Sequence, residues 1–215
     1  MNGPNAPPSR LLLVTDRHQA AAPLDAIVAE AVRAGARWIW LRDRDMERAE
    51  RRDLALRLRD AARRGGARLS IGGDVDLAAE LAADGVHLPA GASVAAARAR
   101  LGPDMLVGIS AHGADDVATA HAQGADYVTL SPIYPTASKP GYGPALGLAG
   151  LARASRLGIP VVALGGITVE RAADCRRAGA AGVAVMGELM RAAARPGGIA
   201  AAVEGFSQAL LPEMA

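Results

Sequence analysis

A proline-rich loop in the middle of the chain carries side chains that suit an anionic ligand. It follows the short apolar run 127–130 and lies within residues 126–144, which contain four of the chain's thirteen prolines. Thr136 and Ser138 offer hydroxyls, and Lys139 is the only lysine of the chain. Hydroxyl and ammonium groups are donors that an anionic oxygen prefers. We therefore expect Thr136 and Ser138 to bind substrate and Lys139 to take part in the chemistry, with a rigid surface loop as the alternative.

Glycines follow two apolar runs late in the chain. Gly165 and Gly166 come after residues 161–164, and Gly187 comes directly after residues 183–186. Because glycine has no Cβ, backbone N–H groups at such turns can approach a phosphate closely, and the usual phosphate site of eight-stranded α/β barrels uses these two turns. Glycines that only make tight turns are the alternative. We predict a phosphate site formed by Gly165, Gly166, Met186 and Gly187.

One histidine stands just beyond an apolar run. Residues 105–110 lead through Ala111 into His112. An imidazole titrates near neutral pH, and the end of a strand would aim it at the mouth of a barrel. We predict that His112 is the acid/base group and that Ser110 contacts the substrate; a hydrogen-bonding loop histidine is the alternative. His87 lies inside another apolar run, where we expect a hydrogen-bonded core histidine.

Two arginines follow a run that contains both tryptophans. In residues 38–44, alternation with period two puts Trp38, Trp40 and Arg42 on one face of a strand. Arg42 and Arg44 could bind a carboxylate or phosphate as a fork beside the ring of Trp40, whereas Trp38 is expected in the core. No cluster of His, Cys, Asp or Glu in the sequence has the spacing of metal ligands, so we predict no metal site built by the protein.

The elements that must position these residues repeat along the chain. Short apolar runs alternate with amphipathic helical segments, and most of these segments end in glycine. Eight apolar strands separated by helices predict a parallel sheet that closes into a (β/α)8 TIM barrel, with the active site at the carboxyl ends of the strands. The strands are expected at residues 11–15, 38–42, 68–71, 85–88, 105–110, 127–130, 160–164 and 182–186.

Composition narrows the class of protein. A chain of 215 residues, half of them apolar, predicts a single domain over residues 10–215 after a disordered tail at 1–9. A net charge of +2 argues against nucleic acid as a partner, and no apolar run approaches the roughly 18 residues of a membrane span. Cys175 is the only cysteine, which excludes an intrachain disulfide and favours the cytoplasm. Whether the chain forms a homodimer stays open.

The sequence resembles the thiamine phosphate synthase and TenI superfamily from Leu11 to about Met190. The matching segments are 13–16 (LVTD), 41–42 (LR), 75–78 (VDLA), 83–88 (ADGVHL), 108–112 (GISAH), 124–128 (GADYV), 131–136 (SPIYPT), 138–139 (SK), 165–167 (GGI) and 182–186 (GVAVM). The resemblance implies a (β/α)8 barrel that handles a phosphorylated thiazole in thiamine biosynthesis. It also implies that the phosphate lies at the glycines after the last two strands.

Two branches of that superfamily differ in what they require. Synthases join a pyrimidine-methyl diphosphate to thiazole phosphate with Mg²⁺, which neutralises the leaving diphosphate. They usually carry Asn-Asp after the third strand and an Asp after the fourth, where this sequence has Gly72-Gly73 and residues 89–92. Trp40 also replaces the usual Gln, and Arg44 the usual Lys. Asp74 could act as a rescue ligand but stands one residue late.

The missing carboxylates favour the other branch. TenI-type tautomerases move a proton on a thiazole phosphate carboxylate without metal, and His112, Arg42 and Lys139 would supply the acid/base group and the carboxylate contacts. We therefore expect a metal-independent thiazole tautomerase with no cofactor. The alternatives are a Mg²⁺-dependent thiamine phosphate synthase and a non-catalytic regulator that binds thiamine-pathway phosphates. Turnover with and without metal would discriminate among the three.

Overall fold

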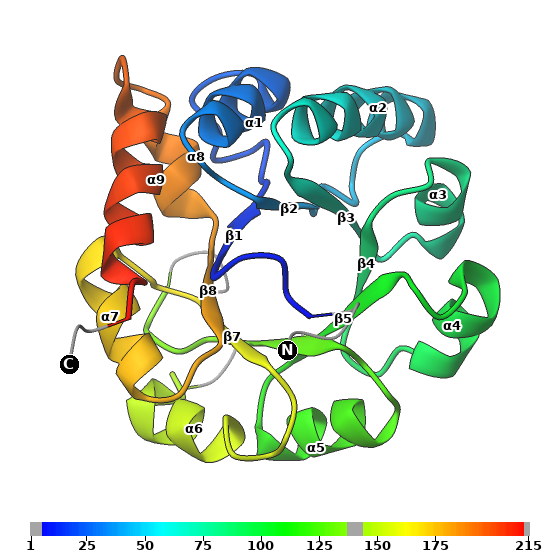
Figure 1. Ribbon diagram of the computed structural model, residues 1–215, viewed down its shortest axis with the longest axis vertical. Helices are drawn as coiled ribbons and strands as arrows, with labels where there is room; N and C mark the ends of the chain where they lie inside the picture. Colours follow the sequence, from blue (N-terminus) through cyan, green and yellow to red (C-terminus); the bar gives the residue numbers. More distant parts are fainter. Residues whose placement is uncertain (1–5, 137–143, 213–215) are drawn as a thin grey trace.

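The computed structural model describes residues 6–136 and 144–212, which form a closed barrel of eight parallel strands (Figure 1). Each strand pairs with the next along the chain, and β8 pairs with β1 to close the sheet. The predicted (β/α)8 fold in one domain is confirmed. The strands are β1 Leu11–Val14, β2 Trp38–Leu41, β3 Arg68–Gly72, β4 Gly85–Leu88, β5 Leu106–Ala111, β6 Tyr127–Leu130, β7 Val161–Leu164 and β8 Gly182–Val185.

Helices form a ring around this barrel, as Figure 1 shows. Helix α3 (Val75–Glu80) ends before Ala82, because Ala82 adopts a φ of 45° and cannot continue a right-handed helix. None of the described helices is long and apolar enough to cross a bilayer. The helices are α1 Leu24–Arg33, α2 Arg48–Arg64, α3 Val75–Glu80, α4 Val94–Leu101, α5 Ala114–Ala122, α6 Gly147–Ala154, α7 Val169–Arg177, α8 Gly187–Ala192 and α9 Gly198–Ala209.

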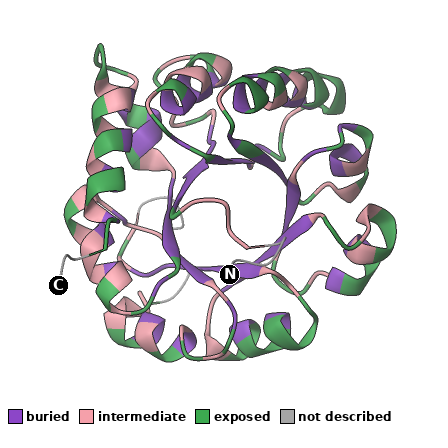
Figure 2. Cartoon of the chain, in the orientation of Figure 1, coloured by how far each residue is buried: buried purple, intermediate pink, exposed green. Residues whose placement is uncertain are grey.

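Side chains fill the inside of the barrel. Trp38 and Trp40 point inward from β2, as the period-two pattern predicted, and they pack with inward-facing residues of five other strands. Figure 2 shows the strands buried and the outer faces of the helices exposed. Because the interior is packed, a ligand can enter only at a mouth of the barrel. The inner cluster is Leu12, Val14, Trp38, Trp40, Leu106, Tyr127, Val162 and Ala184.

Two sequence predictions fall wholly or partly outside the described residues. Residues 1–5 of the expected disordered tail lie there, while residues 6–9 precede β1 and place the hydroxyl of Ser9 3.2 Å from the backbone nitrogen of Leu11. Ser138 and Lys139 also lie outside the described residues. The tail and the roles of these two side chains stay predictions.

Gly108 on β5 provides a test of the packed interior. A Cβ at Gly108 would stand 2.1 Å from Cζ of Tyr127, whose fully buried ring crosses from the neighbouring strand. We expect Gly108→Ala to lower the free energy of unfolding by about 1–3 kcal/mol through overpacking. Gly113→Ala is the matched control, since a Cβ there meets nothing within 4 Å. Equal urea midpoints for the two variants would contradict this account.

Candidate active site

A pocket of about 530 Å³ opens at the carboxyl ends of the strands, where the fold predicts an active site. Every sequence-predicted site residue that the structure describes lines it. The sequence therefore located this pocket, although the role of each residue remains a prediction. These residues are Trp40, Arg42, Arg44, Ser110, His112, Thr136, Gly165, Gly166, Met186 and Gly187.

The turn after β7 requires glycine at both positions. Gly165 and Gly166 have φ angles of 98° and 65°, which L side chains rarely adopt. A Cβ at Gly165 would stand 2.9 Å from Cα of Pro132, and one at Gly166 would stand 2.7 Å from the carbonyl oxygen of Pro135. The backbone of Tyr134 also donates to the carbonyl of Gly165 at 3.0 Å. The turn is therefore held rigidly against the segment that follows β6, and it exposes backbone to the pocket.

Arg171 on α7 is a pocket residue that sequence reasoning missed. Its Nη1 donates to the carbonyl of Gly166 at 2.7 Å, and its guanidinium stands 4.6 Å from the centre of the Tyr134 ring, a cation–π contact. A signal was present, because a basic residue in the first turn of a helix opposes the helix dipole. The placement of Arg171 therefore indicates a role in the contacts of its side chain and not in stabilising the helix.

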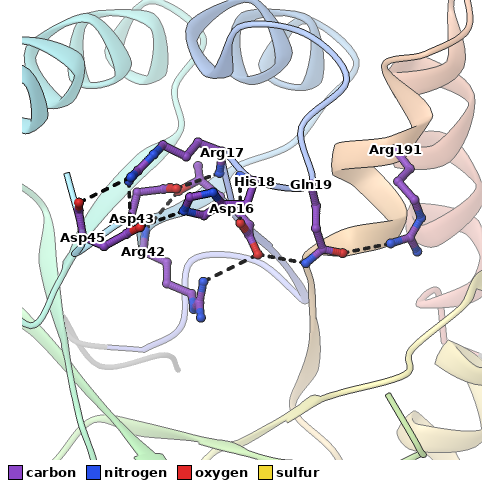
Figure 3. A network of polar contacts seen from close by, with 9 residues as sticks. Asp16, Arg17, His18, Gln19, Arg42, Asp43, Asp45 and Arg191 are labelled. Atoms are coloured by element: carbon purple, nitrogen blue, oxygen red, sulfur yellow. Dashed lines mark hydrogen bonds and ion pairs between the residues drawn. The ribbon is translucent and has the colours of Figure 1, made fainter. Parts of the chain in front are cut away.

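Arg191 and Gln19 join the two ends of the chain at the rim of the pocket. Nη1 of Arg191, on α8, donates to Oε1 of Gln19 at 2.9 Å, and Gln19 Nε2 donates to Asp16 at 2.8 Å. Figure 3 shows this chain of contacts from α8 to the loop after β1. Nothing in the local sequence predicts it, because the contact exists only when β8 pairs with β1.

A buried carboxylate connects the ends of β1 and β2 below Arg42. The hydroxyl of Thr15 donates to Asp43 at 2.5 Å, and the backbone of Arg17 donates to the other oxygen of Asp43 at 2.7 Å. The backbone N–H of Arg42 in turn donates to Thr15 Oγ1 at 3.0 Å. These bonds fix the backbone of Arg42, whose guanidinium stands 3.7 Å from Asp16 (Figure 3).

Arg44 stands beside Arg42 on the same side of the pocket. Partial burial first, and the like charge of Arg42 second, lower the pKa of Arg44 from its usual value. Arg44 makes no hydrogen bond or ion pair with any residue in the described ranges. Arg42, Arg44 and Trp40 therefore line the pocket together, as the sequence predicted. Arg42 has an anionic partner in Asp16, whereas Arg44 has none among the described residues.

His112 is oriented by two contacts after β5. Its Nδ1 lies 2.9 Å from the carbonyl oxygen of Ser131, which assigns the proton of the neutral ring to Nδ1 and the lone pair to Nε2. The backbone N–H of His112 donates to Asp116 at 2.7 Å. The ring is therefore held in one tautomer at the wall of the pocket. Its predicted acid/base role is untested.

His87 supports the floor of the pocket from inside the barrel, as expected for a core histidine. Its Nδ1 lies 2.9 Å from the hydroxyl of Tyr127, and its Nε2 lies 3.2 Å from Ser110 Oγ and 3.1 Å from Thr129 Oγ1. The ring also packs against Trp40, with centroids 3.9 Å apart and ring planes tilted by 42°. Complete burial, and then the charge of Arg44, lower the pKa of His87 to about 3, so the ring is neutral.

The carboxylates around the mouth do not form a metal site. Asp16 and Asp43 are engaged as described above, and Asp74 caps α3 by accepting from the backbone of Leu77 at 2.9 Å. Within residues 6–136 and 144–212, no three His, Cys, Asp or Glu side chains come together as metal ligands. Glu188 is the one carboxylate among the described residues that line the pocket. A Mg²⁺ ion held partly by substrate phosphates needs one or two protein carboxylates, and Glu188 is the one that the described lining of the pocket offers.

Fold and pocket together define a (β/α)8 barrel whose ligand site is rich in arginine and glycine turns. The family model described as thiamine monophosphate synthase matches residues 11–189, and the chain belongs to that family. The family resemblance found in the sequence is therefore confirmed.

Named relatives of similar length support this assignment. A thiamine-phosphate synthase from Chloroflexus aurantiacus is 38% identical over 186 residues, which cover 85% of this chain and 86% of the relative. A Geobacter sulfurreducens protein that carries the same name provisionally is 44% identical over 183 residues, or 84% and 86% of the two chains. The solved structure of thiamine phosphate pyrophosphorylase from Pyrococcus furiosus is 28% identical, with a TM-score of 0.82 over 93% of this chain and 94% of that one.

These names correct one expectation from the sequence. The prediction of a thiazole tautomerase, an isomerase of the TenI branch, is wrong, because relatives at 38–44% identity are named as synthases. The error has a physical origin. The absence of carboxylates at residues 72–73 and 89–92 is evidence about a metal and does not determine the reaction. His112 and the glycine turns serve either reaction and could not discriminate.

The buried His87 predicts a measurable pH dependence. An unfolded histidine takes up a proton near pH 6.5, whereas folded His87 does so only at about 3. The neutral ring therefore contributes stability that is present above about pH 6.5 and is lost, by about 1.4 kcal/mol per pH unit, as pH falls toward 3. We expect His87→Gln to show a shallower decline of unfolding free energy than the wild type between about pH 7 and about pH 5.

A matched variant separates this titration from lost hydrogen bonding. Tyr127→Phe removes the 2.9 Å contact to His87 but keeps the imidazole. Its decline should stay parallel to that of the wild type, since a tyrosine whose pKa burial raises is neutral throughout this range. Urea unfolding of the three proteins at each pH is the measurement, and three parallel curves would show that His87 does not cause the slope.

Proposed function

We propose that this protein is a thiamine-phosphate synthase, a transferase that joins a pyrimidine-methyl diphosphate to thiazole phosphate. The names of relatives that span more than four fifths of both chains support the proposal. The structural observation that carries it is the placement of positive groups at two separate ends of one pocket.

The two ends lie across the barrel from each other. Arg42 and Arg44 follow β2, whereas Arg171 and the turn at Gly165-Gly166 follow β7. In a closed sheet of eight strands in sequential order, β3 and β7 stand opposite, and Arg44 lies over Gly73 at the end of β3. A reaction between two anionic substrates needs two such ends.

The proposed roles follow from these positions. The phosphate of the thiazole substrate would bind the backbone of Gly165, Gly166, Met186 and Gly187, where N–H groups can reach its oxygens. The diphosphate would lie at Arg42 and Arg44, with the pyrimidine ring beside Trp40. Ser110, His112 and Thr136 would contact the ring atoms between the two ends.

The chemistry is a displacement at the pyrimidine methylene. The C–O bond to the diphosphate breaks, and the diphosphate leaves with the bonding electron pair. The ring nitrogen of the thiazole supplies the pair for the new C–N bond, which yields thiamine phosphate and diphosphate. The pocket contributes by holding the two rings in contact and by stabilising charge on the leaving group.

Direct assay of coupling tests the proposal. The purified protein is incubated with both substrates, and thiamine phosphate is detected by chromatography after oxidation to its fluorescent derivative. Product that requires both substrates and scales with released diphosphate is the expected result. Binding of thiazole phosphate without any product, in every buffer tried, would instead support a non-catalytic binder.

Arg171 predicts a selective effect on one substrate. Arg171→Ala removes the donor to the carbonyl of Gly166 and should loosen the turn at the proposed phosphate site. We expect the KM for thiazole phosphate to rise about three- to tenfold, the effect of one lost hydrogen bond. The KM for the pyrimidine diphosphate should change less. Steady-state kinetics with each substrate varied is the measurement.

Arg176→Ala is the control, because Arg176 lies on the same helix but does not line the pocket. Its kinetic constants should match those of the wild type. Equal rises in both KM values for Arg171→Ala would show a general disturbance of the barrel and would contradict the assignment of this end to the thiazole phosphate.

A further inference from the structure

The leaving diphosphate of the proposed reaction needs positive charge. Departure with the bonding pair adds a negative charge to a group that is already anionic, and enzymes neutralise such charge with divalent cations or with arginine and lysine. A Mg²⁺ ion would in turn be held by the phosphate oxygens of the substrate together with one or two carboxylates of the protein. The structure shows which of the two sources this barrel can use.

Space at Gly72 excludes a longer side chain, and the side chain of Arg44 covers Gly73. A Cβ at Gly72 would stand 2.7 Å from Nε1 of Trp40 and 2.8 Å from the carbonyl oxygen of Leu41. Gly73 has a φ of 72°, and a Cβ there would stand 3.2 Å from Cδ, 3.3 Å from Nε and 3.4 Å from Nη1 of Arg44. An indole and a guanidinium therefore cover the two positions at which carboxylate or amide ligands could have projected.

The nearest carboxylate, Asp74, is directed elsewhere. It caps α3 through Leu77 and stands 3.6 Å from Arg51, whose side chain is buried. Arg51 also donates to the carbonyl of Gly72 at 2.7 Å, which fixes the end of β3. Recruiting Asp74 to a metal would remove the helix cap and take from the buried guanidinium of Arg51 its ion pair with Asp74, which is costly.

Among the described residues, Arg44 is a cation that faces this part of the pocket. It lacks a hydrogen-bonded or ion-paired partner among the described residues, and it is partly desolvated next to the like charge of Arg42. Burial is the main cause of the lowered pKa values of Arg51 and His87, and the positive charge of Arg44 lowers both further. Two neighbouring guanidiniums repel each other, and a bound anion would relieve that repulsion while accepting paired hydrogen bonds from each fork.

We propose that Arg44, together with Arg42, binds the diphosphate in place of a divalent cation, so that coupling by this protein does not require metal. The inference rests on the proposed synthase function and identifies how that site neutralises its leaving group. The guanidiniums accept no bonding electrons and transfer no proton; they stabilise the charge on the diphosphate oxygen as the C–O bond breaks.

Titration with inorganic diphosphate tests the binding part directly. In buffer with EDTA, the wild-type protein should bind the ion, and calorimetry should show a tenfold to hundredfold weaker Kd for Arg44→Ala, as expected for loss of a charged hydrogen-bonding group. Arg44→Lys keeps the charge but loses the fork, and its Kd should fall between the two. Although neighbouring groups partly desolvate Arg44, much of its surface is open to solvent, so truncation should not unfold the protein.

Arg33→Ala is the matched control. Arg33 is exposed at the end of α1, which leads to the start of β2 and therefore lies at the opposite end of the barrel from the pocket. Its Kd for diphosphate should equal that of the wild type. Diphosphate binding that appears only with added magnesium, or that Arg44→Ala leaves unchanged, would overturn the inference.

The coupling assay in two buffers separates this inference from the function it rests on. Equal rates of thiamine phosphate formation in EDTA and in magnesium support metal-independent coupling. Product that forms only in magnesium overturns the inference and leaves the synthase function standing. Product in neither buffer overturns the proposed function and coupling without metal alike, and the diphosphate titration then shows whether Arg44 binds the anion in the absence of metal.

Discussion

The indole of Trp40 lies directly on the backbone of Gly72, and this contact governs what the mouth of the barrel can hold. A Cβ at Gly72 would be only 2.7 Å from the indole nitrogen, so the aromatic wall and a longer side chain at this position exclude each other. The side chain of Arg44 lies over the next residue, Gly73, at a longer distance of 3.2 Å from a Cβ placed there. One side of the pocket is thus built from an aromatic ring and guanidiniums, and the charge that it presents is positive.

The packed interior holds this arrangement in place. Trp40 packs against His87, and His87 is hydrogen-bonded to Tyr127, Ser110 and Thr129 on two neighbouring strands. A neutral imidazole suits that role, because a charged ring would be buried beside Arg44. The floor of the pocket is therefore continuous with the core of the barrel. The register of the strands, and not the loops alone, therefore fixes the positions of the polar groups above this floor.

Features that depend on neighbours along the chain could be predicted from the sequence. Eight apolar runs, alternating with helical segments that mostly end in glycine, predicted the barrel, and period two predicted the inward direction of Trp38 and Trp40. The contact of Arg191 with Gln19 could not be predicted, because it joins residues 172 positions apart through barrel closure. The reaction was also out of reach. The missing carboxylates bear only on metal binding, and His112 could serve more than one reaction. The names of relatives were therefore needed to identify the reaction.

The contact between Gln19 and Arg191 also bears on how the protein is made. Gln19 leaves the ribosome early, whereas Arg191 follows it by 172 residues. Strand β1 likewise lacks one of its two neighbours until β8 has been synthesised. A nascent chain can assemble helices and strand pairs during translation. It completes the rim of its pocket only after α8 has been synthesised, so a chain that stops before Arg191 lacks this contact.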